Sequence, residues 1–297
     1  MSDMLSHFTI KLGGSDAPAE MMDDLAEVIV ETNLHLPAMF IIKLYDVDVR
    51  WIDSNQLEIG TEVEIAAQEP GGSSAGTLIK GEITALEPDF DPATPTLQVR
   101  GFDRGHRLHR GRYRKAFIQV SDSDLASTIA GQHGLGSDIS STSEVYEHVY
   151  QSNLTDWEFL QERAKRIGFD CYIQDNKLVF KPSGQSQEQV ELEWGEELKR
   201  FHPRLSSSGQ VKEVIVQGWD PTAKSAIVGR ANTSTAHPEV AAFEQGSSVA
   251  SKVHEGNAQM VIVDRPVHTQ GEADAMAQAI ASLRKQELEV KSVQEYF

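Results

Sequence analysis

Four short runs of β-type sequence, separated by turn sequences, dominate the first 120 residues. The runs are FIIKLYDV at 40–47, TEVEIAA at 61–67, TLIKGEITAL at 77–86 and TLQVRGF at 96–102. The turn sequences contain the Gly and Pro that end strands: EPGGSSAG at 69–76 and EPDFDPATP at 87–95. Strands this short and this closely spaced are typical of an antiparallel barrel or sandwich, so the region is predicted to be a β domain.

A second β-rich region is expected in the last third of the chain. Two segments there have strand patterns: VKEVIVQGWD at 211–220 and QMVIVDRPV at 259–267. The segment 233–256 between them is predicted to be a long loop. A final helix is expected to begin at Thr269, because Thr269 and Glu272 have the spacing of a capping box. Its many alanines favour close packing.

Residues 153–182 predict a helix followed by a β-hairpin, placed between the two β-rich regions. Thr155 and Glu158 have the spacing of another capping box, and the pair Asp175-Asn176 favours a tight hairpin turn. Three apolar residues are predicted to share the buried face of the helix: Trp157, Leu160 and Ile167. We therefore expect a small α+β element here.

A short helix and a linker are expected in front of this element. The helix SDSDLASTIAGQHG at 121–134 can be capped by Ser121 or Ser123. The following GLGSDISSTS at 134–143 consists mostly of small and polar residues, so it is predicted to be a polar linker.

The charge of the chain is strongly negative, yet one strip is basic. The formal net charge is −18 and the isoelectric point is about 4.9. Against this balance, GFDRGHRLHRGRYRKAFI at 101–118 concentrates arginines and two histidines. The strip raises three alternatives: a metal site, a nucleic-acid surface, or a set of arginines that pair with the protein's own acidic residues.

The third alternative is favoured. His106 and His109 stand among arginines, which disfavour a bound dication. Nucleic acid remains open, because Phe102, Tyr113 and Phe117 interleave with the basic residues. A chain with a net charge of −18 repels phosphate backbones, however, and Arg suits forked pairing with carboxylates, within one chain or between subunits.

Nothing in the sequence predicts an enzyme. It contains neither a nucleophile-elbow signature nor a His-Glu-x-x-His motif, so we expect no catalytic residues, no cofactor and no metal. The single cysteine, Cys171, lies in an apolar alternation and is predicted to be buried. No signal peptide and no membrane-spanning run are expected.

Several stretches resemble the phage late control gene D protein family. These are LIKGEITALEP at 78–88, LQVRGFDRGHRLHRGRYRKAF at 97–117, SDSDLASTIAGQHGL at 121–135 and QSNLTDWEFLQERAKRIGFDCYIQDNKLVF at 151–180. The most specific residues are Gln151, Asn153, Asp156, Trp157, Glu158, Phe159, Leu160, Ile167 and Gly168. The resemblance extends over about residues 8–290 and is strongest from about 77 to 182. The family includes baseplate hubs of contractile phage tails, the hub region of VgrG spike proteins in type VI secretion, and hubs of extracellular contractile injection systems.

The resemblance implies a mainly β (α+β) chain with two tandem tube-type antiparallel β-barrel domains, flanking helices and a small inserted α+β element. The first barrel is expected at 1–133, the insertion at 134–185, and the second barrel, lacking its closing strands, at 186–297.

The same resemblance implies a structural baseplate hub without enzymatic activity. Three copies would form a ring whose six similar barrels dock on a hexameric inner tube, while the other side holds the spike or tip protein and baseplate wedge proteins contact the hub. Assembly is expected in the bacterial cytoplasm, as part of a phage tail or injection particle. A VgrG-type effector carrier is the alternative, and a nucleic-acid-binding protein using residues 100–115 is less favoured. Neither a small-molecule substrate nor a nucleic acid is expected as partner.

Five arginines are candidates for contacts with a neighbouring subunit or the tube. They follow the end of the first predicted barrel: Arg104, Arg107, Arg110, Arg112 and Arg114.

Overall fold

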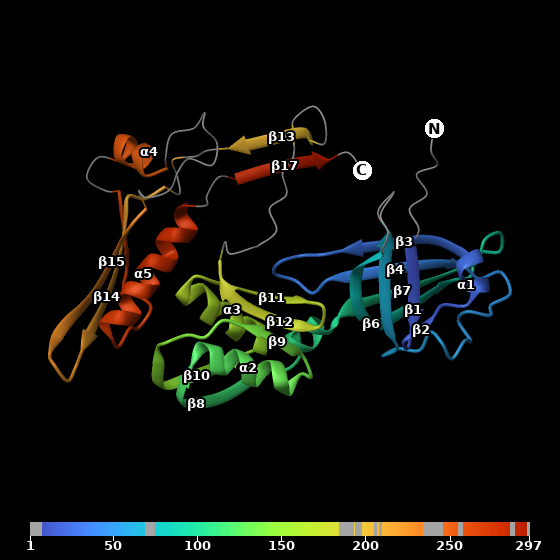
Figure 1. Ribbon diagram of the computed structural model, residues 1–297, viewed down its shortest axis with the longest axis horizontal. Coiled ribbons are helices and arrows are strands. Elements are labelled where there is room, and N and C mark those ends of the chain that lie inside the picture. Colours follow the sequence, from blue (N-terminus) through green and yellow to red (C-terminus); the bar gives the residue numbers. More distant parts are fainter. Residues whose placement is uncertain are drawn as a thin grey trace. The chain divides into compact units, whose positions relative to one another are not determined.

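The structure, a computed structural model, describes residues 8–68, 75–183, 193, 198–204, 207, 210–233, 246–254, 258–285 and 289–295 (Figure 1). The chain forms two compact units. The first comprises Met1–Ser141, Glu147–Leu160 and Cys171–Phe180. The second comprises Thr142–Tyr146, Gln161–Asp170 and Lys181–Phe297. The predicted mainly β composition is confirmed.

Seven strands of the first unit form one antiparallel sheet in the order β2-β1-β5-β6-β7-β4-β3. Their bounds are β1 (Phe8–Leu12), β2 (Ser15–Asp16), β3 (Leu25–Glu31), β4 (Met39–Tyr45), β5 (Glu62–Gln68), β6 (Ala75–Asp89) and β7 (Thr96–Asp103), with helix α1 (Ala19–Asp23) between β2 and β3. The four predicted strands are confirmed. The turn expected from residue 87 begins later, because Glu87 and Pro88 still pair with β7.

The sheet folds because each strand buries every second side chain. On β4, Phe40, Ile42 and Leu44 are all fully buried, and on β7 Leu97 and Val99 are too. One core cluster gathers such residues from β1, β4, β5, β6 and β7. A single apolar face shared by so many strands requires the sheet to curl around it.

The ring of Phe40 packs directly against the backbone of β7 in this core. Phe40 is paired with Gly101 on β7, and its ring covers that glycine. A Cβ added to Gly101 would lie 2.1 Å from Cζ of Phe40, so any side chain there collides with the ring. Glycine on β7 is therefore required by packing.

The middle of the chain combines short strands and two helices. Their bounds are β8 (Tyr113–Ser121), α2 (Asp122–Gln132), β9 (Gly136–Ile139), β10 (Val145–Leu154), α3 (Asp156–Ile167), β11 (Phe169–Gln174) and β12 (Lys177–Pro182). Strands β8 and β10 form a two-stranded sheet, and β11, β12 and β9 form a three-stranded one. The linker predicted at 134–143 is therefore wrong in part, because β9 pairs in parallel with β12.

Local signals for these elements are confirmed. Ser121 caps α2 in a reciprocal box with Asp124. The Thr155 N–H donates to Glu158 at 2.9 Å, while the Glu158 N–H donates to Thr155 Oγ1 at 3.1 Å. The hairpin turn has φ of 50° at Asp175 and 59° at Asn176, the left-handed conformation that such turns require.

The second unit contains a three-stranded sheet in the order β15-β14-β16, covered on one face by helix α5 (Figure 1). The bounds are β14 (Glu213–Asp220), β15 (Ser225–Asn232), β16 (Gln259–Ile262) and α5 (Gln270–Lys285). Ala273 and Ala277 are fully buried, and a Cβ on Gly229 would lie 2.2 Å from the Ala273 carbonyl oxygen. The close packing expected from the alanines is confirmed.

Two predictions for this unit need correction. The loop expected at 233–256 contains a helix, α4 (Gly246–Val253). Thr269 caps α5 by accepting the Glu272 N–H at 3.1 Å, but the Glu272 carboxylate accepts the His268 N–H instead of closing a box with Thr269. Strands β13 (Leu198–Arg204) and β17 (Glu289–Glu295) form a separate antiparallel pair.

The two barrels are not confirmed, because every sheet in the described ranges is open. Among these residues no helix is long and apolar enough to cross a membrane.

We predict that Gly101→Ala lowers the free energy of unfolding by about 1–3 kcal/mol, since the new methyl group collides with the fully buried ring of Phe40. Gly131→Ala is the matched control, because no atom lies within 4 Å of a Cβ there and the residue is helical. The control is expected to leave stability unchanged or raise it by up to about 1 kcal/mol. Urea denaturation measures both, and equal effects would refute the packing argument.

Candidate functional site

The basic strip lies where β7 ends, and a 3₁₀ helix, η1 (Arg104–His109), connects it to β8. Asp103 caps η1 by accepting the Gly105 N–H at 2.8 Å, and it also accepts the Ala38 N–H at 2.9 Å. Leu108 is fully buried and anchors the turn. Burial raises the pKa of Asp103, although the two backbone hydrogen bonds oppose the shift. Asp103 and Leu108 therefore fix the position at which the basic strip begins.

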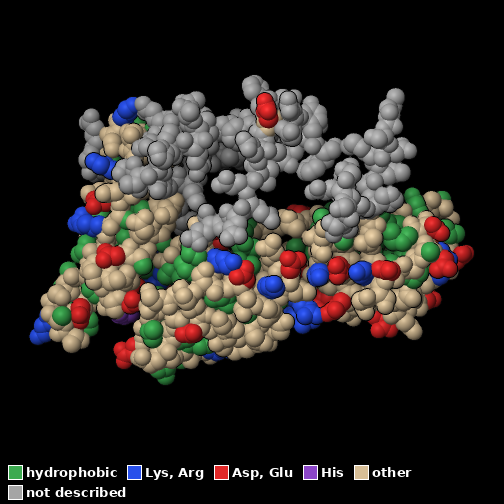
Figure 2. All heavy atoms as spheres, viewed as in Figure 1, with side chains coloured by type: hydrophobic (Ala, Val, Ile, Leu, Met, Phe, Trp, Pro, Cys, Tyr) green, Lys and Arg blue, Asp and Glu red, His purple; other side chains and the backbone are tan. Residues whose placement is uncertain are grey.

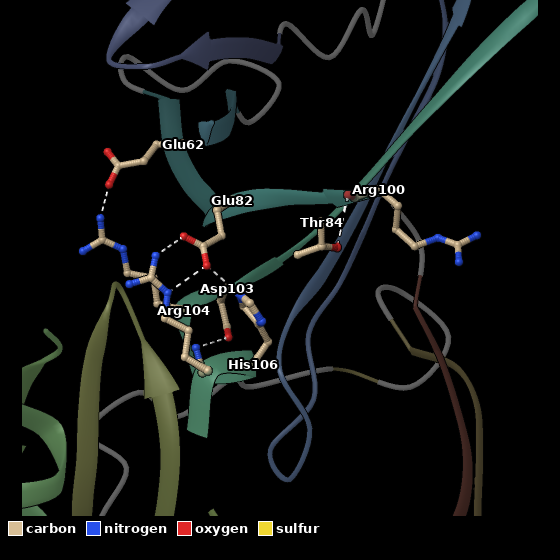
Figure 3. A network of polar contacts seen from close by, with 9 residues as sticks. Glu62, Glu82, Thr84, Arg100, Asp103, Arg104 and His106 are labelled. Atoms are coloured by element: carbon tan, nitrogen blue, oxygen red, sulfur yellow. Dashed lines mark hydrogen bonds and ion pairs between the residues drawn. The ribbon is translucent and has the colours of Figure 1, made fainter. Parts of the chain in front are cut away.

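A buried carboxylate, Glu82 on β6, lies beneath the strip (Figure 3). It accepts a hydrogen bond from Arg107 Nε at 2.8 Å, a second one from Arg107 Nη2, and is also paired with His106 Nε2. Burial alone would raise the pKa of Glu82, but the hydrogen bonds from Arg107 and His106 outweigh it and hold the pKa below its ordinary value. Glu82 in turn raises the pKa of Arg107.

Two further arginines pair with neighbouring strands. Arg104 is bound to Glu62 on β5. Arg100 lies 3.3 Å from Glu87 on β6, and Figure 3 shows it pointing away from the cluster around Glu82. Both pairs are largely exposed to solvent, so each contributes little to stability.

Arg112 connects the start of β8 to the beginning of helix α3. Its Nη1 donates to the Asn153 carbonyl oxygen at 2.9 Å, and its Nη2 donates to Glu158 at 2.9 Å. Glu158 is also the acidic member of the α3 capping box. Arg112 therefore serves the local fold.

Arg110 and Arg114 differ from the other arginines of the strip. Both are exposed, and neither side chain has an ion pair or hydrogen bond with any residue that the structure describes. Of the five predicted interface arginines, Arg104, Arg107 and Arg112 are bound within the chain. The side chains of Arg110 and Arg114 are therefore available for contacts outside the described residues.

The aromatic residues near the strip pack within the first unit. His109 stacks on Trp157 with ring centroids 5.1 Å apart, and burial lowers the pKa of His109. Phe117 stacks on Phe159 at 5.8 Å. A stacking platform for nucleic-acid bases needs such rings exposed, so this arrangement disfavours that alternative.

Three residues of the insertion helix are predicted from the sequence to form its buried face. Of these, Trp157 and Leu160 are buried and Ile167 is half-buried.

Sequence reasoning missed one polar cluster at the beginning of α3. Asp156, which is 1% exposed, lies 2.8 Å from His133 Nε2 and accepts a hydrogen bond from Gln151 at 2.9 Å. Gln151 also donates to the Leu154 carbonyl oxygen. The cluster connects the end of α2 to the start of α3. Its only local signal is the polar pair Gln151 and Asp156 around the capping box.

The face of the molecule drawn in Figure 2 carries charges of both signs. Figure 2 shows Lys and Arg side chains next to Asp and Glu side chains along the face in view, without one continuous basic area. Within the described ranges no group of three or more His, Cys, Asp or Glu could hold a metal ion.

Comparison with known proteins identifies a family and a fold. The model of a family described as the Alg8 N-terminal domain matches residues 2–288. This is not the late control gene D family named from the sequence, so that assignment needs correction. No curated protein matches the chain.

Two solved structures share the fold. A 43 kDa tail protein of prophage MuSo2 from Shewanella oneidensis has a TM-score of 0.63 at 15% identity, covering 92% of this chain and 77% of that one. A tail protein from Neisseria meningitidis MC58 has a TM-score of 0.58 at 13% identity, covering 92% of this chain and 74% of that one. The expected likeness to phage tail proteins is confirmed at the level of the fold.

We predict that Glu82→Gln lowers the free energy of unfolding at neutral pH by about 2 kcal/mol, because Arg107 and His106 lose a charged acceptor. The folded-state pKa of Glu82 lies below its ordinary 4.5. Its contribution is therefore complete above pH 4.5 and is lost as the pH falls through the lower folded-state pKa. The difference between the two proteins should shrink below pH 4.5.

Urea denaturation over a pH series measures this difference. Glu87→Gln is the control, since its pair with Arg100 is exposed and is worth less than about 1 kcal/mol. A difference that grows on acidification would contradict the assignment of Glu82.

Proposed function

The chain belongs to the Alg8 N-terminal domain family, and from its fold we propose that it is a structural baseplate hub of a contractile injection machine. The observation that carries the proposal is the likeness to two phage tail proteins over 92% of the chain.

The proposed hub is a homotrimer that joins a hexameric inner tube to a spike or tip protein. Two β-rich units per chain support this arrangement, since three chains then supply six β-rich units to match a sixfold tube. In the proposal each unit completes a tube-type barrel, and baseplate wedge proteins contact the outside of the ring.

The basic strip supports an assembly role over nucleic-acid binding. Three of its arginines are held by carboxylates of the same chain, and the net charge of −18 repels phosphate backbones. What remains exposed is a small set of charges on a large surface, which suits contacts between proteins.

Negative-stain electron microscopy tests the proposal. The full chain is imaged alone and mixed with its cognate tube protein, with the tube protein alone as control. We expect threefold rings with a sixfold-like outline that cap the ends of tubes. Monomers that never bind to tubes would contradict the hub, and salt-sensitive binding of duplex DNA would favour the nucleic-acid alternative instead.

A further inference from the structure

Strands β3 and β8 are two of the strands of the first unit that have an unpaired edge among the described residues. Strand β3 is the last strand of the seven-stranded sheet, and β8 has β10 as its single neighbour. An open edge presents a row of free N–H and C=O groups, which can pair with a strand of another chain.

The outward side chains of β8 begin with a cation. Arg114, Ala116 and Ile118 alternate along the strand and are all exposed, with Ile118 71% exposed. Arg110 precedes the strand and is also exposed. The strand therefore exposes one large apolar side chain, Ile118, together with a cation, Arg114, whose side chain has no partner among the described residues.

The outward side chains of β3 carry the opposite charge. Glu27, Ile29 and Glu31 alternate and are exposed, with Ile29 40% exposed. Within the described part of the chain neither glutamate side chain forms an ion pair or hydrogen bond. The segment of sequence that contains β3 is acidic as well, because residues 8–68 contain twelve Asp and Glu but only three Lys and Arg.

We propose that the edge of β8 in one copy pairs with the edge of β3 in a second copy, with Ala116 opposite Ile29. Arg114 then meets Glu31 if the strands run antiparallel and Glu27 if they run parallel, so the charges match in both directions. Ile118 lies diagonally from Ile29, within reach of an apolar contact.

This inference rests on the proposed function, since it supplies the contact that holds the copies of the hub together. Different surfaces of the two copies meet, so the contact is head-to-tail and closes into a ring when its rotation allows.

Sedimentation of the full chain at physiological ionic strength tests the charges. Arg114→Glu and the double variant Glu27→Arg/Glu31→Arg should each raise the dissociation constant of the assembly about tenfold or more, the loss expected from a pair turned repulsive. Combining all three substitutions should restore association. Lys224→Glu is the matched control, because it reverses an exposed cation in the turn after β14 and should change nothing.

A disulfide tests the register. Ala116→Cys combined with Ile29→Cys should give chains cross-linked to one another on oxidation, and Cys171, which is 2% exposed, should not interfere. Circular dichroism establishes that each variant is folded.

The outcomes separate this inference from the proposed function. Assemblies that survive both charge reversals and form no cross-link overturn the inference, while the hub stands and its copies meet elsewhere. Reversals that dissociate the assembly without restoration in the combined variant also overturn it, because Arg114 then faces another acidic surface. A wild-type chain that stays monomeric at every concentration overturns both.

Discussion

The carboxylate of Glu82 lies buried at the end of a curled sheet, where an unpaired charge would cost several kcal/mol. Arg107 and His106 reach it because Asp103 fixes the start of η1 and Leu108 holds the turn against the core. The position of η1, and with it the direction of every arginine that follows, depends on this arrangement. The bonds from Arg107 and His106 thus compensate the buried charge of Glu82 and tie η1 to β6.

The other internal pairs then decide which charges remain available. Arg104 and Arg112 find carboxylates on β5 and α3, and each of these exposed pairs adds little to stability. Each pair also neutralises a cation of the basic strip. Of the candidate interface arginines, Arg110 and Arg114 remain unpaired within the described residues.

Features with a local cause could be predicted from the sequence, and long-range ones could not. Alternation on β4 and β7 and the capping box of α3 depend on residues a few positions apart, so their patterns are visible. Glu82 and Arg107 are 25 residues apart, and any of 45 acidic residues fits the arginine equally well in a single sequence. Strand β9, with the sequence GSDI, is a strand because β12 pairs with it, and its own residues favour a turn. The features that could not be predicted from the sequence therefore depend mostly on pairing between segments that are distant in the chain.

An acidic chain that assembles with its own copies must overcome their mutual repulsion. At physiological ionic strength charges more than about 8 Å apart are largely screened, whereas a pair in contact across two strand edges is not. The net charge of −18 therefore acts weakly between whole chains, while a few placed cations act at full strength at the contact. In the proposed assembly, internal pairs already neutralise most of the basic strip, so the few remaining cations limit where an acidic neighbour can bind. A continuous basic surface would accept an acidic neighbour at many positions, so sparse free charge makes the proposed contact between copies more specific.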